Sequence, residues 1–217
     1  MRTLAPFLAL LLAATPLMGQ AEPDERMSFF LTSVGPGHGA DLGGLEGADA
    51  HCLHLAYAVG SADATWRAYL SAAASDGQPA INARDRIGDG PWYNFEGVMI
   101  ARDVEHLHGE EANLTKETVL TEAGQVVRGR GDSPNRHDIL TGSALDGPLA
   151  EGDGDTTCSN WTSSGEGSAM VGHFDRTGGG ANPTSWNAAH GSRGCGQEDL
   201  RGTGGDGLFY CFATDPD

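Results

Sequence analysis

An acidic, glycine-rich loop carries the first residues whose side chains suit a metal ion. It runs from Ser143 to Cys158 with the sequence SALDGPLAEGDGDTTC. Carboxylate oxygens on a flexible loop are the ligands that Ca²⁺ takes, so the loop predicts a calcium site. The spacing does not complete an EF-hand loop, and a solvated loop of an acidic protein gives the same pattern. The candidate ligands are Asp146, Glu151, Asp153 and Asp155.

A second candidate metal site lies in the segment DVEHLHGEE, residues 103–111. On a strand, His106 and His108 would share one face, and acidic residues flank both. Imidazole and carboxylate groups together suit Zn²⁺ or Cu²⁺. Solvated surface is the alternative interpretation. We interpret a further pair, His51 and His54, as helix surface.

The segment from Asn182 to Gly194 combines an aromatic residue with polar groups, a composition suited to recognition of a sugar or a peptide. Its candidate ligand-binding residues are Trp186, Asn187, His190 and Arg193. In this interpretation, the indole stacks on an apolar face and the polar groups fix hydrogen bonds. Alternatively, the indole packs in the core and the rest forms turns.

Signals for catalysis are poor, so we assign no catalytic residue. The sequence contains no Gly-x-Ser-x-Gly elbow, no His-Glu-x-x-His motif and no phosphate loop. A hydrolase would need a pocket that brings His137, Asp138 or His190 together, since scattered triads leave no spacing pattern. The tripeptide Arg130-Gly131-Asp132 matches an integrin-binding motif, but three residues recur by chance and also suit a turn.

The N-terminal residues 1–21 predict a secretory signal peptide, with an apolar run and small residues before cleavage. We expect a secreted or periplasmic chain with a linker at 22–27, one domain at 28–213, a tail at 214–217 and no transmembrane segment. The formal net charge is -17, and removal of Arg2 makes it more negative by one. Such a surface argues against nucleic acid and anionic membranes as partners. We expect a monomer.

The elements that would position these residues indicate an α+β fold. In the segment from Gly44 to Ser71, apolar residues recur every three or four positions up to Val59, which predicts a helix that ends at Gly60. Alternation from Trp66 then predicts a strand. The sequence also predicts a short helical turn at 80–90, a hairpin at 118–127, and strands at 28–34, 98–101, 137–141, 159–163, 169–174 and 208–213.

Four cysteines in an exported chain predict two disulfides, because the compartment is oxidising and no C-x-x-C pair is present. The cysteines are Cys52, Cys158, Cys195 and Cys211. Sequence alone leaves all three pairings open.

Several segments, in order along the chain, resemble endostatin, the C-terminal domain of some collagens, and its bacterial relatives. The similarity begins with GLEGADAHCLHLAYAVGSADATWRAYLS and continues through Pro91-Trp92, TVLTEAGQVV, LTGSALDG, TTCSNWTSS and LFYCFA. The resemblance implies a single domain with a variant of the C-type lectin fold, in which one main helix packs on short, mostly antiparallel strands. It also implies nested disulfides, with Cys52 bonded to Cys211 and Cys158 to Cys195.

The resemblance implies the fold of this chain more strongly than its function, because similar folds host many different functions. The family's heparin-binding surface uses arginines and its zinc site uses N-terminal histidines, whereas this acidic chain continues after cleavage as EPDERM. Ser185-Trp186-Asn187 resembles the calcium-binding and sugar-binding strand of C-type lectins, but Ala188 stands where they have Asp. The leading hypothesis is a non-enzymatic domain that recognises an extracellular glycan or protein. The alternatives are a periplasmic divalent-metal-binding protein and a hydrolase.

Overall fold

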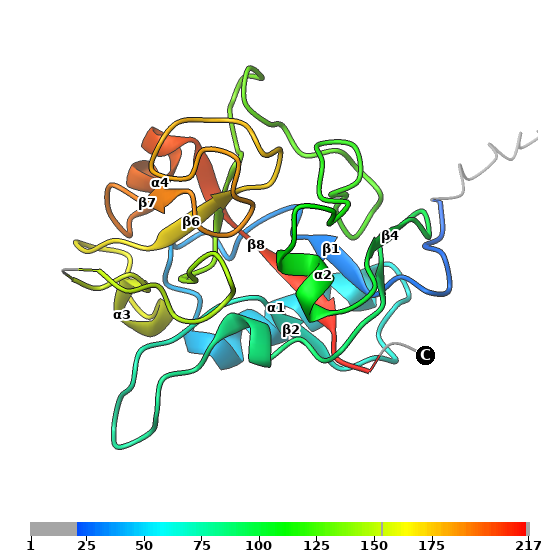
Figure 1. Cartoon of the computed structure of the whole chain (residues 1–217), viewed down its shortest axis with the longest axis horizontal. Coiled ribbons are helices and arrows are strands. Elements are labelled where there is room, and N and C mark those ends of the chain that lie inside the picture. The colour runs from blue at the N-terminus through cyan, green and yellow to red at the C-terminus, as the bar shows by residue number, and fades with distance from the viewer. Residues whose placement is uncertain (1–20, 153, 216–217) are drawn as a thin grey trace, which may run out of the picture.

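The structure is a computed structural model that describes residues 21–152 and 154–215. It is a mixed α+β fold, as the sequence predicts (Figure 1). The helices are α1 (Gly44–Ala58), α2 (Val104–His108), α3 (Cys158–Trp161) and α4 (Gln197–Thr203), with a 3-10 turn at Ala83–Asp85. The strands are β1 (Phe29–Leu31), β2 (Trp66–Ala68), β3 (Trp92–Tyr93), β4 (Met99–Ala101), β5 (Asp138–Leu140), β6 (Met170–His173), β7 (His190–Gly191) and β8 (Gly205–Ala213).

Strand β8 is the centre of the larger sheet, whose order is β1-β8-β5-β6-β7 with β2 also paired to β8. Figure 1 shows β8 running through the middle of the molecule, between β1 and the β6–β7 region. Its pairing with β1 and β2 is antiparallel and its pairing with β5 is parallel. The prediction that the first strand pairs near the end of the chain is therefore confirmed, with Phe30 opposite Cys211.

The sheet is buried on both faces, because successive side chains of β8 enter two different parts of the core. Phe209 and Cys211 pack with α1, the disulfides and Trp161. Tyr210 and Phe212 pack on the other face, in a cluster that includes Trp92. A strand that is buried on both faces has a continuous apolar sequence, and the segment LFYCFA in β8 has that pattern.

Helix α1 matches the helix predicted from the apolar periodicity and packs against β2. One acidic residue on this helix, Asp49, is buried. It is 8% exposed, and its carboxylate pairs with Arg86 at 2.7 Å and with Arg67 at 2.8 Å. It also accepts a hydrogen bond from the Ala68 amide. Asp49 therefore joins the helix to β2 and to the 3-10 turn region.

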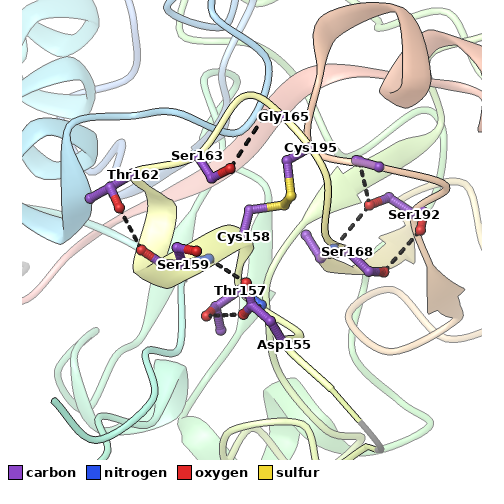
Figure 2. The surroundings of a disulfide bond; sticks show 12 residues. Asp155, Thr157, Cys158, Ser159, Thr162, Ser163, Gly165, Ser168, Ser192 and Cys195 are labelled. Atoms are coloured by element: carbon purple, nitrogen blue, oxygen red, sulfur yellow. Dashed lines mark hydrogen bonds between the residues drawn. A yellow bond between two sulfur atoms is a disulfide. The ribbon is translucent and has the colours of Figure 1, made fainter.

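Both disulfides are present and nested, Cys52–Cys211 and Cys158–Cys195. The first joins α1 to β8 and therefore ties the two ends of the domain together. The second joins α3 to the segment before α4 (Figure 2). The Cys52–Cys211 disulfide has a sequence separation of 159 residues. In the chain-entropy model, closing a loop of that length stabilises a fold by about 5 kcal/mol.

The strand predicted at 159–163 is wrong, because α3 occupies that segment. The four residues Cys158–Trp161 have φ angles from 49° to 66°, which makes α3 a single left-handed turn. Local side chains hold it: Thr157 Oγ1 accepts from the Asn160 amide, and Trp161 Nε1 donates to the carbonyl of Ser71 at 2.7 Å. These contacts, together with the disulfide, outweigh the β propensity of the sequence.

Within the described residues, no helix is long and apolar enough to cross a membrane.

Candidate metal centre

Three neighbouring strands bring three histidines and an aspartate to one end of the sheet. His137 directly precedes β5 and Asp138 begins it, while His173 ends β6 and His190 begins β7. Because β5 and β6 are antiparallel, the start of one lies beside the end of the other, and Asp138 is opposite His173. The pairing of β6 with β7 then places His190 opposite Val171.

All three imidazoles converge on one oxygen, Oδ1 of Asp138. Nε2 of His137 lies 3.2 Å from it, Nε2 of His173 lies 3.4 Å from it and Nε2 of His190 lies 3.6 Å from it. The ligand atoms of His137, Asp138 and His173 lie within 4.8 Å of one another. These three side chains are buried, whereas that of His190 is 24% exposed and approaches from the rim.

The second ring nitrogen, Nδ1, of each histidine is hydrogen-bonded to an oxygen atom of the protein. This arrangement assigns the ring proton to Nδ1 and leaves the lone pair of Nε2 facing Asp138. Metal-binding histidines characteristically have such an outer partner, which fixes the ring orientation. The Nδ1 partners are Asp175 Oδ1 at 3.2 Å for His137, the Pro183 carbonyl at 2.8 Å for His173 and the Gly191 carbonyl at 3.0 Å for His190.

The centre holds polar atoms that the protein itself leaves without hydrogen bonds. Among the described residues, no group is hydrogen-bonded to either carboxylate oxygen of Asp138 or to Nε2 of His173, and all three atoms are buried. Lone pairs that converge on a buried carboxylate repel one another and forgo the hydration they would have in water. A cation between them, either protons or a metal ion, removes that cost.

Protons on Nε2 are the alternative to a metal ion, and the pKa shifts describe that protonated arrangement, because lone pairs that face a carboxylate would raise its pKa. Burial alone would raise the pKa of Asp138, but the surrounding His173, His190 and His137 outweigh it and lower the pKa to about 2. The Asp138 carboxylate in turn raises the pKa of His190 above its ordinary value. The site therefore holds a carboxylate anion at every physiological pH and attracts positive charge.

The three separations that involve Asp138 Oδ1 are close to those of a tetrahedral transition-metal site, whereas His190 lies outside the group of ligand atoms that are all within 4.8 Å of one another. With Zn²⁺ distances of ~2.0–2.1 Å to nitrogen and oxygen, the ligand atoms of a tetrahedron lie about 3.3 Å apart. The three separations from Asp138 Oδ1 are 3.2, 3.4 and 3.6 Å. The ligand set of imidazole nitrogens with one carboxylate suits Zn²⁺ or Cu²⁺ and is poor for Ca²⁺, which prefers six to eight oxygens.

A glycine loop, residues 178–180, lies against the rings of His173 and His190. A Cβ on Gly178 would lie 2.3 Å from Cε1 of His173, and one on Gly180 would lie 3.0 Å from the ring of His190. By contrast, a Cβ on Gly179 would meet no atom within 4 Å. Only glycine lets the backbone lie this close to the imidazoles.

Among the described residues of the acidic loop, the predicted calcium ligands do not form a cluster. Asp146 and Glu151 are exposed, and Asp153 lies outside the described residues. The carboxylate of Asp155 accepts hydrogen bonds from the amide and hydroxyl of Thr157 and from the amide of Ser159 (Figure 2). Asp155 therefore caps the turn that leads into α3, because short acidic side chains readily bind backbone amides two to four residues on.

The prediction that His106 and His108 share a face is wrong, because their segment is helix α2 and not a strand. Residues two apart point in different directions on a helix. His108 is partly buried, with Nε2 2.7 Å from the hydroxyl of Tyr69 and Nδ1 2.7 Å from the Val104 carbonyl. Nδ1 of His106 faces the amide of Arg102.

The predicted recognition surface is not formed by its four residues. Trp186 is 3% exposed and packs against Tyr69, and Asn187 is 1% exposed. The amide nitrogen of Asn187 is used inside the protein, where it donates to the Tyr69 hydroxyl at 3.1 Å. Arg193 is exposed and paired with Asp199. Of the four, His190 alone belongs to the metal centre, so the alternative of a core-packed indole is the correct one.

His137, Asp138 and His190 do come together, which a hydrolase site would need in addition to a pocket. Among the described residues, however, no hydroxyl is hydrogen-bonded to Nε2 of any of the three histidines, so a Ser–His–Asp relay is not formed. His173 was missed at the sequence level. The available signal was that His137 begins one predicted strand, 137–141, and His173 lies near the end of another, 169–174.

Neither models of known protein families nor curated protein sequences match this chain.

Proposed function

We propose that the protein binds one divalent transition-metal ion of the Zn²⁺ class through His137, Asp138, His173 and His190. The observation that carries this proposal is the convergence of three imidazole Nε2 atoms on a buried carboxylate that has no hydrogen-bond partner among the described residues. His137, Asp138 and His173 form the compact ligand group, and a shift of His190 toward them would complete the tetrahedron that is typical of structural zinc sites.

Protons are the competing cation at this site. Protonated His190 paired with Asp138 would satisfy part of the charge, and the raised pKa of His190 favours that state. A proton on one rim histidine leaves Nε2 of buried His173 still without a partner. A metal ion satisfies all four groups at once, so it explains the arrangement more completely.

The test is zinc binding by the purified, chelator-treated protein. We expect one equivalent of zinc by calorimetry and by elemental analysis of the dialysed complex. His173→Ala should weaken binding by more than about 100-fold, since loss of an outer-shell partner alone costs about 10–100-fold. His190→Ala serves as a second ligand variant at the partly exposed rim, where loss of folding is less of a risk.

His54→Ala is the matched control, because His54 is an exposed histidine on α1, outside the centre. It should bind zinc as the wild type does. Wild-type protein that takes up no zinc, copper, nickel or cobalt at micromolar concentrations would overturn the proposal. Equal zinc affinity in the His173 and His54 variants would do the same.

We also propose that the chain is an endostatin-like domain with a C-type-lectin-like fold. Support comes from the nested disulfides, from the pairing of β1 with β8 and from the packing of α1 beside β2. An experimental structure that fails to superpose on endostatin over these elements would contradict it. Recognition of a glycan or matrix protein stays a prediction, to be tested on a glycan array and a matrix-protein panel.

A further inference from the structure

The 129–135 loop, GRGDSPN, directly precedes the metal ligands His137 and Asp138. Its residues 130–134 are exposed, while Gly129 at its base is buried. A backbone bond from the Arg136 amide to the Arg128 carbonyl, 3.1 Å long, closes the base. The loop is thus an exposed segment attached to the centre through one short stretch of chain.

Asp175 connects this loop to the metal centre. Its side chain is 4% exposed, and Oδ1 lies 3.2 Å from Nδ1 of His137. Its other oxygen, Oδ2, accepts a hydrogen bond of 2.6 Å from the Arg130 amide. A Cβ on Gly129 would lie 2.5 Å from the same Oδ2, so the carboxylate also packs directly on the loop backbone.

Both oxygens of the Asp175 carboxylate are engaged, Oδ1 with Nδ1 of His137 and Oδ2 with the Arg130 amide. Because the side chain is buried between these two groups, a displacement of the His137 ring also displaces the acceptor of the Arg130 amide. Asp175 therefore links the position of His137 directly to the backbone of the loop.

We propose that a metal ion on Nε2 of His137 immobilises the 129–135 loop through Asp175, so that presentation of the loop depends on metal occupancy. This inference rests on the proposed zinc site. An ion on Nε2 withdraws charge from the ring and makes Nδ1–H a stronger donor to Asp175. It also fixes the ring, which holds the carboxylate against the Arg130 amide.

The loop offers Arg130, Gly131 and Asp132 to solvent, with Asp132 held in place. Its carboxylate accepts from the Gly129 amide at 2.8 Å and pairs with Lys116 at 2.6 Å. These contacts keep the turn closed but connect it only to the surface. The link through Asp175 is what ties it to the interior.

The experiment is amide hydrogen exchange of the purified protein, with chelator and with excess zinc, resolved at the Arg130 amide by NMR. We expect zinc to slow exchange at Arg130 by about fivefold or more, the lower end of typical couplings between sites. In Asp175→Asn, zinc should still bind, about 10–100-fold more weakly, and exchange at Arg130 should no longer respond to saturating zinc.

Asp199→Asn is the matched control, because Asp199 is also a carboxylate in an ion pair but lies outside this link. Its Arg130 exchange should respond to zinc as in the wild type. Wild-type protein that binds zinc with unchanged Arg130 exchange would overturn the coupling and leave the zinc site standing. Absence of zinc binding would overturn both. The wild-type comparison decides the question even if the Asp175 variant does not fold.

Discussion

When neither a proton nor a metal ion lies between Asp138 and the surrounding imidazoles, its carboxylate lowers the stability of the fold. Its buried carboxylate oxygens have no hydrogen-bond donor among the described residues, and such a group costs about 1–3 kcal/mol. Asp138→Asn introduces an amide that can donate to the histidine nitrogens. At pH 8, in chelator, we expect this variant to be about 1–3 kcal/mol more stable than the wild type by urea unfolding.

The same substitution removes a metal ligand, so added zinc should stabilise Asp138→Asn much less than the wild type. This pair of opposite effects separates a metal site from a structural ion network. If the variant is less stable than the wild type in chelator, then Asp138 stabilises the fold through its charge and the metal interpretation loses its main support.

His108 predicts how stability depends on pH. Burial lowers the pKa of His108 in the folded protein, and its Nε2 faces the Tyr69 hydroxyl with Nδ1 on the Val104 carbonyl. The unfolded chain has the ordinary pKa of about 6.5, so it takes up the proton first as pH falls. The folded state therefore loses stability below pH ~6.5.

We expect the contribution of His108 to the free energy of unfolding, measured in chelator, to fall between pH 7 and pH 5, while His190, whose pKa is raised, contributes with the opposite sign. His108→Gln should show a shallower fall over this range, since the titrating group is absent. His54→Ala, on the exposed face of α1, should keep the wild-type slope. A slope unchanged in His108→Gln would assign the pH dependence to other groups.

The element α3 shows where sequence patterns mislead. The segment SNWTS has aromatic and β-branched residues and so predicts a strand, yet Ser159 and Asn160 have φ angles of 56° and 54°. A disulfide and the contacts with Ser71 and Asp155 determine its conformation. Cys195 and Ser71 are distant in the sequence, and nothing in the sequence indicates that Asp155 pairs with the Ser159 amide. Helix α1 and strand β8, whose patterns are longer, were predicted from the sequence alone.

The left-handed turn is itself testable at Ser159, whose side chain is exposed. A left-handed conformation costs an L-residue about 1–2 kcal/mol, while glycine in place of serine raises unfolded-state entropy at a cost of about 0.5–1 kcal/mol. Ser159→Gly should therefore raise the free energy of unfolding, by about 0.5–1 kcal/mol. Ser163→Gly, just beyond the turn, gains no such relief and should destabilise. Chemical denaturation of both variants distinguishes the two outcomes.

The glycine loop beside the metal centre provides a second test at the scale of an element. In Gly178→Ala, the new methyl would overlap the His173 ring, and the φ angle of 159° disfavours alanine as well. We expect zinc affinity to fall by about 10-fold or more, as it does when an outer-shell group is disturbed. Gly179→Ala has open space and should bind zinc normally. Equal affinities would show that the loop does not hold His173 in place.

The candidate site could not be predicted from the sequence for a reason that concerns the whole chain. Its ligands lie at 137, 138, 173 and 190, and only the register of β5, β6 and β7 brings them together. The sequence clusters that suggested metal sites, at 103–111 and 146–155, are dense in ligands because the chain is acidic. Candidate ligands that lie close together in the sequence were therefore surface residues. The buried ligands are far apart in the sequence, and the pairing of three strands brings them together.

Zinc bound at this centre should stabilise the whole molecule, because its ligands join three strands of a sheet that continues into β8. His137 and Asp138 belong to the β5 end, and β5 pairs in parallel with β8, which carries the disulfide to α1. Unfolding of the sheet therefore has to release the ion. For one site, zinc at 100 times its dissociation constant adds about 2.7 kcal/mol to the free energy of unfolding.

This linkage is measured by urea unfolding at several zinc concentrations, followed in parallel by tryptophan fluorescence and circular dichroism. Both probes should shift together, with stability rising by about 1.4 kcal/mol for each tenfold rise in free zinc above the dissociation constant. Calcium should have no such effect, because the ligands are mainly imidazole nitrogens. If zinc shifted one probe alone, then the β5–β6–β7 end would unfold separately from β8, and the ion would stabilise only that end of the sheet.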